Sequence, residues 1–170
     1  MQGVKKEYIF ISISLLVSLF IYLFFRTERT VVNEIFLALI SPAKYDELRS
    51  WMSNNFPLNE HVIYSLPEGL WVFCITLSSK HLFIQVGKYK LNCEFIPLVF
   101  AIALELFQLL HVTNGRFDVW DIVASVFGWT IARYALKYQP VKQDIFQLVT
   151  IRTVICVSSY SIVYLAHVWN

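Results

Sequence analysis

Five polar or charged side chains lie close together in the second half of the chain, within otherwise apolar sequence. They are Glu105, Gln108, Arg116, Asp118 and Asp121. Carboxyl groups can act as general acids and bases, and an arginine can hold a phosphate or a carboxylate through paired hydrogen bonds. An ionisable group at the centre of a membrane-spanning helix costs at least about 2.5 kcal/mol. The group therefore predicts either polar contacts that hold helices together or a site that acts on a ligand.

These polar residues lie in, or in the turn between, two apolar segments that are long enough to cross a membrane. Residues 95–112 and 119–136 are joined by the polar turn 113–118. A connection this short makes neighbouring helices run antiparallel. The sequence therefore predicts a tight antiparallel hairpin of two helices, with the polar residues towards one end of it.

Spacing within this hairpin places its polar and small residues on surfaces that face each other. Glu105 and Gln108 share one helical face with Ala101. The second helix has a matching face, formed by Asp118, Asp121, Ser125, Gly128 and Ala132. Small residues let helix backbones approach closely, so we expect those of the second helix to contact the first.

A further acidic group belongs to an earlier apolar segment, residues 62–79. Glu68 lies there in the sequence Ser65-Leu-Pro-Glu68-Gly69. We expect Glu68, Glu105 and Asp121 to meet at one level, with Arg116 and Asp118 above them. So many carboxyl groups around one arginine cannot all stay charged away from water. One should keep its proton, or a cation or the positive group of a ligand should enter.

Structural explanations remain open for the same residues. Ser65 and Glu68 match a capping box, in which they would only satisfy the start of a helix. Glu105, Gln108 and Asp121 could form hydrogen bonds between helices without binding anything. Arg116 and Asp118 could form an exposed salt bridge in the turn, which would contribute little.

The composition places the whole chain in a membrane. Its 170 residues are 57% hydrophobic, whereas soluble domains average about 45–50%. The sequence therefore predicts an all-α integral membrane protein with one domain, a bundle of about five transmembrane helices in which the third and fourth form the tight hairpin. The expected spans are residues 8–25, 62–79, 95–112, 119–136 and 149–168.

The distribution of basic residues predicts how these spans are oriented. With five spans, nine lysines and arginines fall on the side of the amino terminus and five on the other side. The amino terminus should therefore be cytoplasmic and the carboxyl terminus extracytoplasmic. Residues 8–25 should be a retained anchor, because Arg26-Thr-Glu-Arg29 follows in place of a cleavage site for a signal peptidase.

Residues 26–61 should form an extracytoplasmic loop. Apolar side chains with helical spacing predict an amphipathic helix within it, either on the membrane surface or packed on the bundle. They are Tyr45, Leu48, Trp51, Met52 and Phe56. Residues 31–40 are too short to span and should re-enter the membrane or lie flat.

Other binding classes find no support in the sequence. A net charge of +2 is too small to suggest nucleic acid. Cys74, Cys93 and Cys156 have neither metal-ligand spacing nor the even number of a disulfide framework. We therefore expect no cofactor and no metal.

The motif Glu105-x-x-Gln108, then seven residues, then Arg116-Phe-Asp118-x-x-Asp121 and later Gly128 resembles the VanZ-like family of small multi-pass bacterial membrane proteins. The resemblance covers about 30 residues. It implies a link to the cell envelope, since the family's namesake is associated with resistance to the glycopeptide antibiotic teicoplanin. It implies no mechanism.

The chain departs from the family pattern in ways that make it a divergent member. Ser125 stands where the family usually has asparagine, and Ala132 stands in place of a second glycine. An Asp-Lys pair and a histidine near the second span are replaced only loosely by residues 59–61 and Glu68. A fifth span lies beyond the common core of four.

Three functional hypotheses follow. The first is a polar pocket open to the outer leaflet that binds the head group of a lipid, a lipid-linked envelope precursor or another amphiphile. Arg116 would hold an anionic group, while Asp121, Glu105 and Gln108 would orient the ligand or relay a proton. The second is a membrane enzyme with paired carboxylates, which the lack of a nucleophile beside a histidine disfavours. The third is an accessory subunit of another membrane protein.

Overall fold

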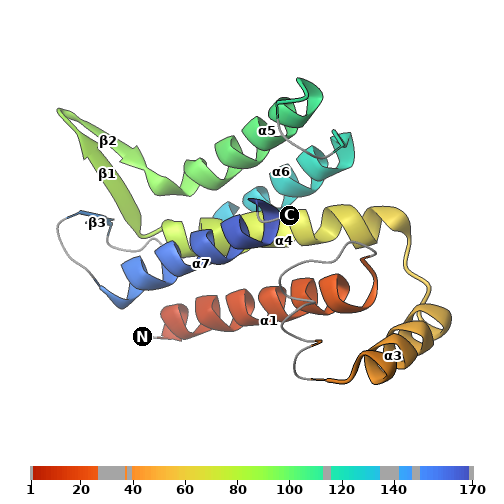
Figure 1. Ribbon diagram of the computed structural model, residues 1–170. Coiled ribbons are helices and arrows are strands. Elements are labelled where there is room, and N and C mark those ends of the chain that lie inside the picture. The colour runs from red at the N-terminus through yellow and green to blue at the C-terminus, as the bar shows by residue number, and fades with distance from the viewer. Residues whose placement is uncertain are drawn as a thin grey trace.

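The protein is mostly helical in the computed structural model (Figure 1). The structure describes residues 2–26, 37, 40–112, 116–134, 142–146 and 150–168. The helices are α1 (Gln2–Phe24), α3 (Pro42–Asn55), α4 (Glu60–Ser79), α5 (Ile96–Leu109), α6 (Val119–Tyr134) and α7 (Ile151–Val168), with a short 3-10 helix at Cys93–Phe95. The strands are β1 (Leu82–Val86), β2 (Tyr89–Asn92) and β3 (Gln143–Asp144).

Helix α4 lies at the centre of the bundle and contacts α1, α5, α6 and α7. Helices α1 and α4 lie side by side and run in opposite directions (Figure 1). The last turn of α5 and the first turn of α6 lie at the same end of the molecule as α3, which we call the α3 end. The amino terminus and the strands lie at the other end, which we call the hairpin end after the β-hairpin formed by β1 and β2.

The central place of α4 follows from its sequence, which is apolar or small on all sides of the helix. One side contributes Val72 and Ile75 to a core cluster that includes Ala101 of α5. Another side contributes Cys74 and Leu77 to a cluster with α1 and α6.

The closest helix contact joins α4 to α6 and differs from the one expected. A Cβ atom on Gly128 would overlap the carbonyl oxygen of Gly69, and one on Gly69 would lie 2.7 Å from the carbonyl oxygen of Ala124. Gly128 therefore faces α4, and the prediction that the small residues of α6 pack on α5 is wrong there. Ala132 also packs with Cys74 and Leu77 of α4. The reason is that Gly69 removes a second side chain at the crossing, so two backbones can meet.

Two described helices, α1 and α4, are long and apolar enough to cross a membrane. Helices α5 and α6 are shorter than the predicted spans, with 14 and 16 residues. Helix α7 has 18 residues and begins at Ile151, two residues later than the predicted span 149–168. Within the described residues, two helices thus meet the requirement by length and composition, and the expected bundle of five spans is not confirmed.

A small sheet at the hairpin end shows that the all-α prediction is wrong in this region. Its strand order is β2-β1-β3, with β1 antiparallel to β2 and parallel to β3. Gly87 has φ +60, the left-handed conformation that favours glycine in a tight turn. The sequence signal is an alternation of β-branched and aromatic residues on both sides of this glycine. The expected spans leave these residues in a loop between residues 79 and 95.

Helix α3 lies where an amphipathic helix was expected. It packs on the end of α1, since the hydroxyl group of buried Tyr45 donates a hydrogen bond to the carbonyl oxygen of Leu23. Leu48 and Trp51 remain exposed. The expectation for residues 31–40 falls largely outside the described residues.

Candidate functional site

Four acidic residues from three parts of the chain converge at the α3 end. Glu68 comes from α4, Glu105 from the last turns of α5, and Asp118 and Asp121 from the start of α6. The carboxyl group of Glu105 interacts electrostatically with all three of the others. Glu68 and Glu105 are only 6% and 4% exposed, so little solvent reaches the cluster to screen this repulsion.

The position of Glu68 shows that the capping-box explanation is wrong. Helix α4 begins at Glu60, and the side chain of Asn59 caps it by accepting a hydrogen bond from the N–H group of His61. Ser65 and Glu68 therefore lie inside the helix, with Pro67 between them. They are available to the cluster because another residue satisfies the helix start.

Two of the acids also order the start of α6. Glu105 Oε2 accepts a hydrogen bond from the N–H group of Asp118 at 3.1 Å. Asp118 Oδ1 in turn accepts one from the N–H group of Trp120 at 2.9 Å. Asp118 therefore acts as a helix cap, and Glu105 ties that cap to α5.

Several buried oxygen atoms in the cluster have no hydrogen-bond partner of good geometry. They are Asp121 Oδ1, Ser65 Oγ and Ser125 Oγ. Ser65 lies beside the Asp121 carboxyl group, and Ser125 is one turn further along α6. A buried polar group without a partner costs about 1–3 kcal/mol. Water or the donor groups of a ligand would satisfy these atoms.

Among the described residues, Arg26 supplies a positive charge to the cluster, although its sequence position marks it only as a charge that follows the first apolar segment. It interacts favourably with Asp121. Its guanidinium group donates a hydrogen bond to the carbonyl oxygen of Tyr64 at 2.9 Å and lies over the rings of Tyr22 and Tyr64. Its Nε atom is buried and has no partner. The sequence offers one signal for this role, since Arg26 directly follows the first apolar segment and so lies at the same end of the bundle as the acids.

The remaining predicted residues lie at the edge of the cluster. Arg116 is exposed, and within the described chain no hydrogen bond or ion pair joins it to an acid. Gln108 is half-buried, one turn beyond Glu105. The structure thus brings together Glu68, Glu105, Asp118 and Asp121, with Arg26 in the place expected for Arg116.

These positions predict different effects on stability for two matched arginine variants. Arg26→Gln should lower the free energy of unfolding by about 1–3 kcal/mol, because it removes a charge from beside Asp121 and a donor from the Tyr64 carbonyl group. Arg116→Gln should change it by less than about 0.5 kcal/mol, as expected for an exposed side chain. Thermal melting in detergent compares the two. Equal losses would contradict the assignment of Arg26.

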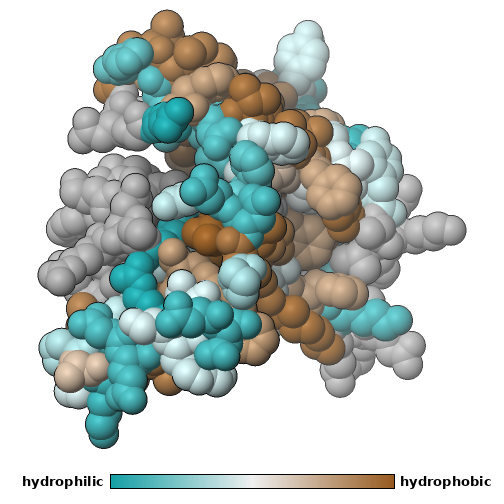
Figure 2. Space-filling model, turned by 90° about the vertical axis from the view of Figure 1, so that its right-hand side faces the viewer, coloured by the Kyte–Doolittle hydropathy of each residue, from teal (hydrophilic) through white to brown (hydrophobic). Residues whose placement is uncertain are grey.

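The surface around the site is polar in one region and apolar in another. Figure 2 looks onto the α3 end, where hydrophilic surface gathers at the lower left over α3, and hydrophobic surface covers much of the top and right. Apolar side chains exposed near the acids include Leu109, Leu110 and Trp120. A ligand reaching the acids would meet both kinds of surface.

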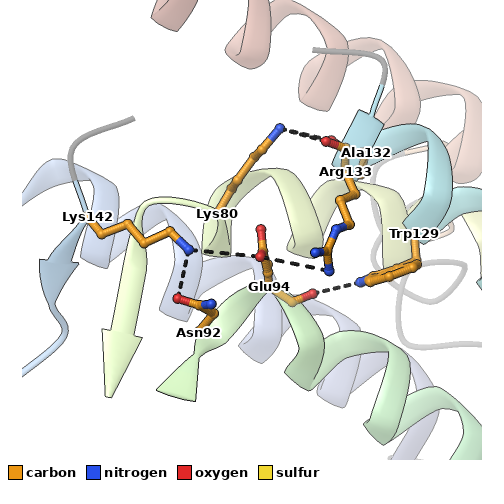
Figure 3. A network of polar contacts seen from close by, with 7 residues as sticks. All are labelled: Lys80, Asn92, Glu94, Trp129, Ala132, Arg133 and Lys142. Carbon is orange, nitrogen blue, oxygen red and sulfur yellow. Dashed lines mark hydrogen bonds and ion pairs between the residues drawn. The ribbon is translucent and has the colours of Figure 1, made fainter. Parts of the chain in front are cut away.

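A second polar network lies at the hairpin end and is structural (Figure 3). Glu94 lies 4.0 Å from Arg133 and 3.9 Å from Lys142, and its carbonyl oxygen accepts a hydrogen bond from the indole N–H group of Trp129. Lys80 donates to the carbonyl oxygen of Arg133 at the end of α6, where a cation complements the helix dipole. Burial lowers the pKa of Lys80, while nearby Glu7 and Glu94 oppose this effect.

Helix α1 is joined to this end by a buried pair. Glu7 Oε2 lies 2.8 Å from His81 Nε2, and both side chains are buried. A small cavity adjoins the pair and is lined also by Ile11 and Ile155. The pair fixes the start of α1 against the end of α4.

The described residues contain no group of three or more His, Cys, Asp or Glu side chains arranged to hold a metal ion. No model of a known protein family matches the chain, and neither the curated proteins nor the solved structures include a match.

Proposed function

We propose that the acidic cluster binds the polar head group of a membrane lipid or of a lipid-linked envelope precursor. The observation that carries this proposal is the set of buried oxygen atoms without a hydrogen-bond partner of good geometry, on Ser65, Asp121 and Ser125. The Asp121 oxygen is an acceptor and the serine hydroxyl groups can donate or accept, in a cluster where carboxyl groups outnumber cations among the described residues. The ligand should therefore present donors, such as hydroxyl or ammonium groups.

Arg26 would meet the anionic part of the same head group. Its buried Nε atom has a donor to offer, and its contacts with the rings of Tyr22 and Tyr64 hold the guanidinium group in place. Arg116, being exposed, would meet the ligand only on its way in. The division between acceptors and one fixed cation suits a zwitterionic or glycosylated phosphate head group.

The proposal includes a membrane location and an orientation. Helix α1 supports a membrane location, because Ile9, Ile13 and Leu16 are more than half exposed on a helix apolar enough to span. We propose a multi-pass protein of the cytoplasmic membrane with the hairpin end in the cytoplasm, in keeping with the distribution of lysines and arginines. The VanZ-like motif supports a role in the cell envelope, such as tolerance of glycopeptide antibiotics.

Mass spectrometry of lipids carried by the purified protein tests this function. Asp121→Asn should lose the lipid class that the parent protein carries, because an amide replaces the charged acceptor. Asp144→Asn is the matched control, since Asp144 is a buried acid at the hairpin end whose side chain accepts a hydrogen bond from the N–H group of Phe146. It should keep the lipid. An unchanged lipid profile in Asp121→Asn would contradict the proposal.

A further inference from the structure

The ribbon formed by β1 and β2 has two faces of opposite character. Residues directly opposite each other in an antiparallel pair project to the same face. Ile84 pairs with Leu91 and Val86 pairs with Tyr89, so these four residues form what we call the apolar hairpin face. The alternate positions form the polar hairpin face, with Phe83, Gln85, Lys90 and Asn92.

Most of the apolar hairpin face is uncovered. Val86, Tyr89 and Leu91 are 55%, 79% and 57% exposed. On the polar face, Phe83 is the exception to the polar pattern, and the Lys90 ammonium group lies 4.9 Å from its ring centre. The Phe83 ring on the polar hairpin face is thus in contact with Lys90, whereas three large apolar side chains on the apolar hairpin face remain exposed.

The base of the apolar hairpin face is continuous with the core of the bundle. Ile84 packs against a cluster formed by Leu82, Cys93 and Cys156, the last of which belongs to α7. The ribbon then projects beyond the bundle beside the start of α5 (Figure 1). The face that packs against helices at its base therefore continues outwards as an exposed apolar surface.

We propose that the apolar hairpin face inserts into the lipid interface at the hairpin end of the molecule. The inference rests on the proposed membrane location. An exposed apolar surface also begins directly after β2, with Phe95, Ile96 and Val99 at the start of α5. The ribbon would thus lie on the bilayer as an amphipathic element does, with its apolar face towards the acyl chains and its polar face towards water.

Charge favours lipid over a second copy of the chain as the occupant. Lys88 and Lys90 are exposed, and residues 82–92 contain no carboxylate. The lysines would attract the anionic head groups of a membrane leaflet. In a symmetric dimer through this face, the lysines of both copies would be brought together without a compensating acid. Tyr89 also belongs to the residue types that collect at membrane interfaces.

Site-directed spin labelling tests the proposal in the full-length protein. Single cysteines at positions 86, 89 and 91 are labelled and compared with matched cysteines at 85 and 90 on the polar face. The protein is reconstituted in vesicles of phosphatidylcholine and phosphatidylglycerol. The native cysteines are buried, and the unsubstituted protein measures their background. Collision with oxygen reports contact with lipid, and collision with a water-soluble nickel complex reports contact with water.

The expected result is an alternation along the ribbon, with a higher ratio of oxygen to nickel collisions at 86, 89 and 91 than at 85 and 90. Equal ratios on the two faces would overturn the proposal, and so would protection of the apolar face from both reagents, which would indicate a protein partner. A label at Leu16, an exposed position of α1, distinguishes failure of the hairpin proposal from failure of the proposed membrane location. Lipid contact at 16 without alternation in the ribbon would overturn the hairpin proposal alone, whereas water contact at 16 would overturn the membrane location as well.

The lysines provide a second measurement. Lys88→Glu combined with Lys90→Glu should lower the oxygen-to-nickel ratio of a label at 89 in anionic vesicles and leave it nearly unchanged in pure phosphatidylcholine. The reason is that attraction to anionic lipid weakens while the apolar contact remains. The same decrease in both kinds of vesicle would contradict the part assigned to the lysines.

Discussion

Replacing Gly128 with leucine should separate α4 from α6 and lower the free energy of unfolding by more than about 3 kcal/mol. Overpacking in a core usually costs about 1–3 kcal/mol when neighbouring side chains can move. Here the first added carbon would overlap the backbone carbonyl group of Gly69, which cannot move without its helix. Gly128→Ala should already be destabilising, and thermal melting followed by circular dichroism measures both variants.

Two comparisons sharpen this test. Val126→Leu enlarges an exposed residue of the same helix and should melt like the parent protein. Gly69→Ala places its new carbon 2.7 Å from the carbonyl oxygen of Ala124, so it should destabilise as well. The double alanine variant should lose less than the sum of the two single losses, because one displacement of α6 relieves both overlaps. A Gly128→Leu protein as stable as its parent would rule out this close contact.

The second large effect concerns binding at the acidic cluster. Glu105→Gln should abolish most binding of the carried lipid while leaving the melting temperature equal to or above that of the parent protein. The amide oxygen can still accept the hydrogen bond from the Asp118 N–H group, and one negative charge among buried carboxyl groups is removed. The lost charged acceptor is worth about 1.5–3 kcal/mol, or roughly a tenfold to hundredfold loss of affinity.

The same substitution at the other end of the molecule should give the opposite pattern. Glu94→Gln leaves Arg133 and Lys142 without their carboxylate partner, so it should lower the melting temperature and keep the lipid. Lipid mass spectrometry and thermal melting of both variants read out binding and stability separately. If Glu105→Gln lost stability and kept its lipid, the cluster would be structural.

The sequence predicted the meeting of Glu105, Asp118 and Asp121 because local spacing determines it. A short turn and helical periodicity suffice to place residues on neighbouring ends of two helices. Glu68 belongs to another helix, so its place in the cluster could be predicted only from its depth in an apolar segment, which is similar to that of Glu105. These inferences used distances along a helix, which are the same in almost any fold.

Other features could not be reached because they depend on which helices become neighbours. Arg26 joins the cluster only because α1 packs against α4, and no local pattern states that pairing. Gly128 is expected on α5 because the short turn makes α5 the neighbour of α6 in sequence, and nothing local indicates that Gly69 of α4 lies opposite it. The strands were missed for a different reason, since the alternation on both sides of Gly87 is a local signal that the strong apolar segments obscured.

The contact between Gly69 and Gly128 also limits where a bound molecule can go. Gly69 directly follows Glu68, so the two backbones meet immediately beside the acids, with no space for even a methyl group. No water column can pass along the seam between α4 and α6. If the cluster binds a head group as proposed, that group has to leave this seam by the end at which it entered, so the site would be closed on this side and would not act as a conduit across a membrane.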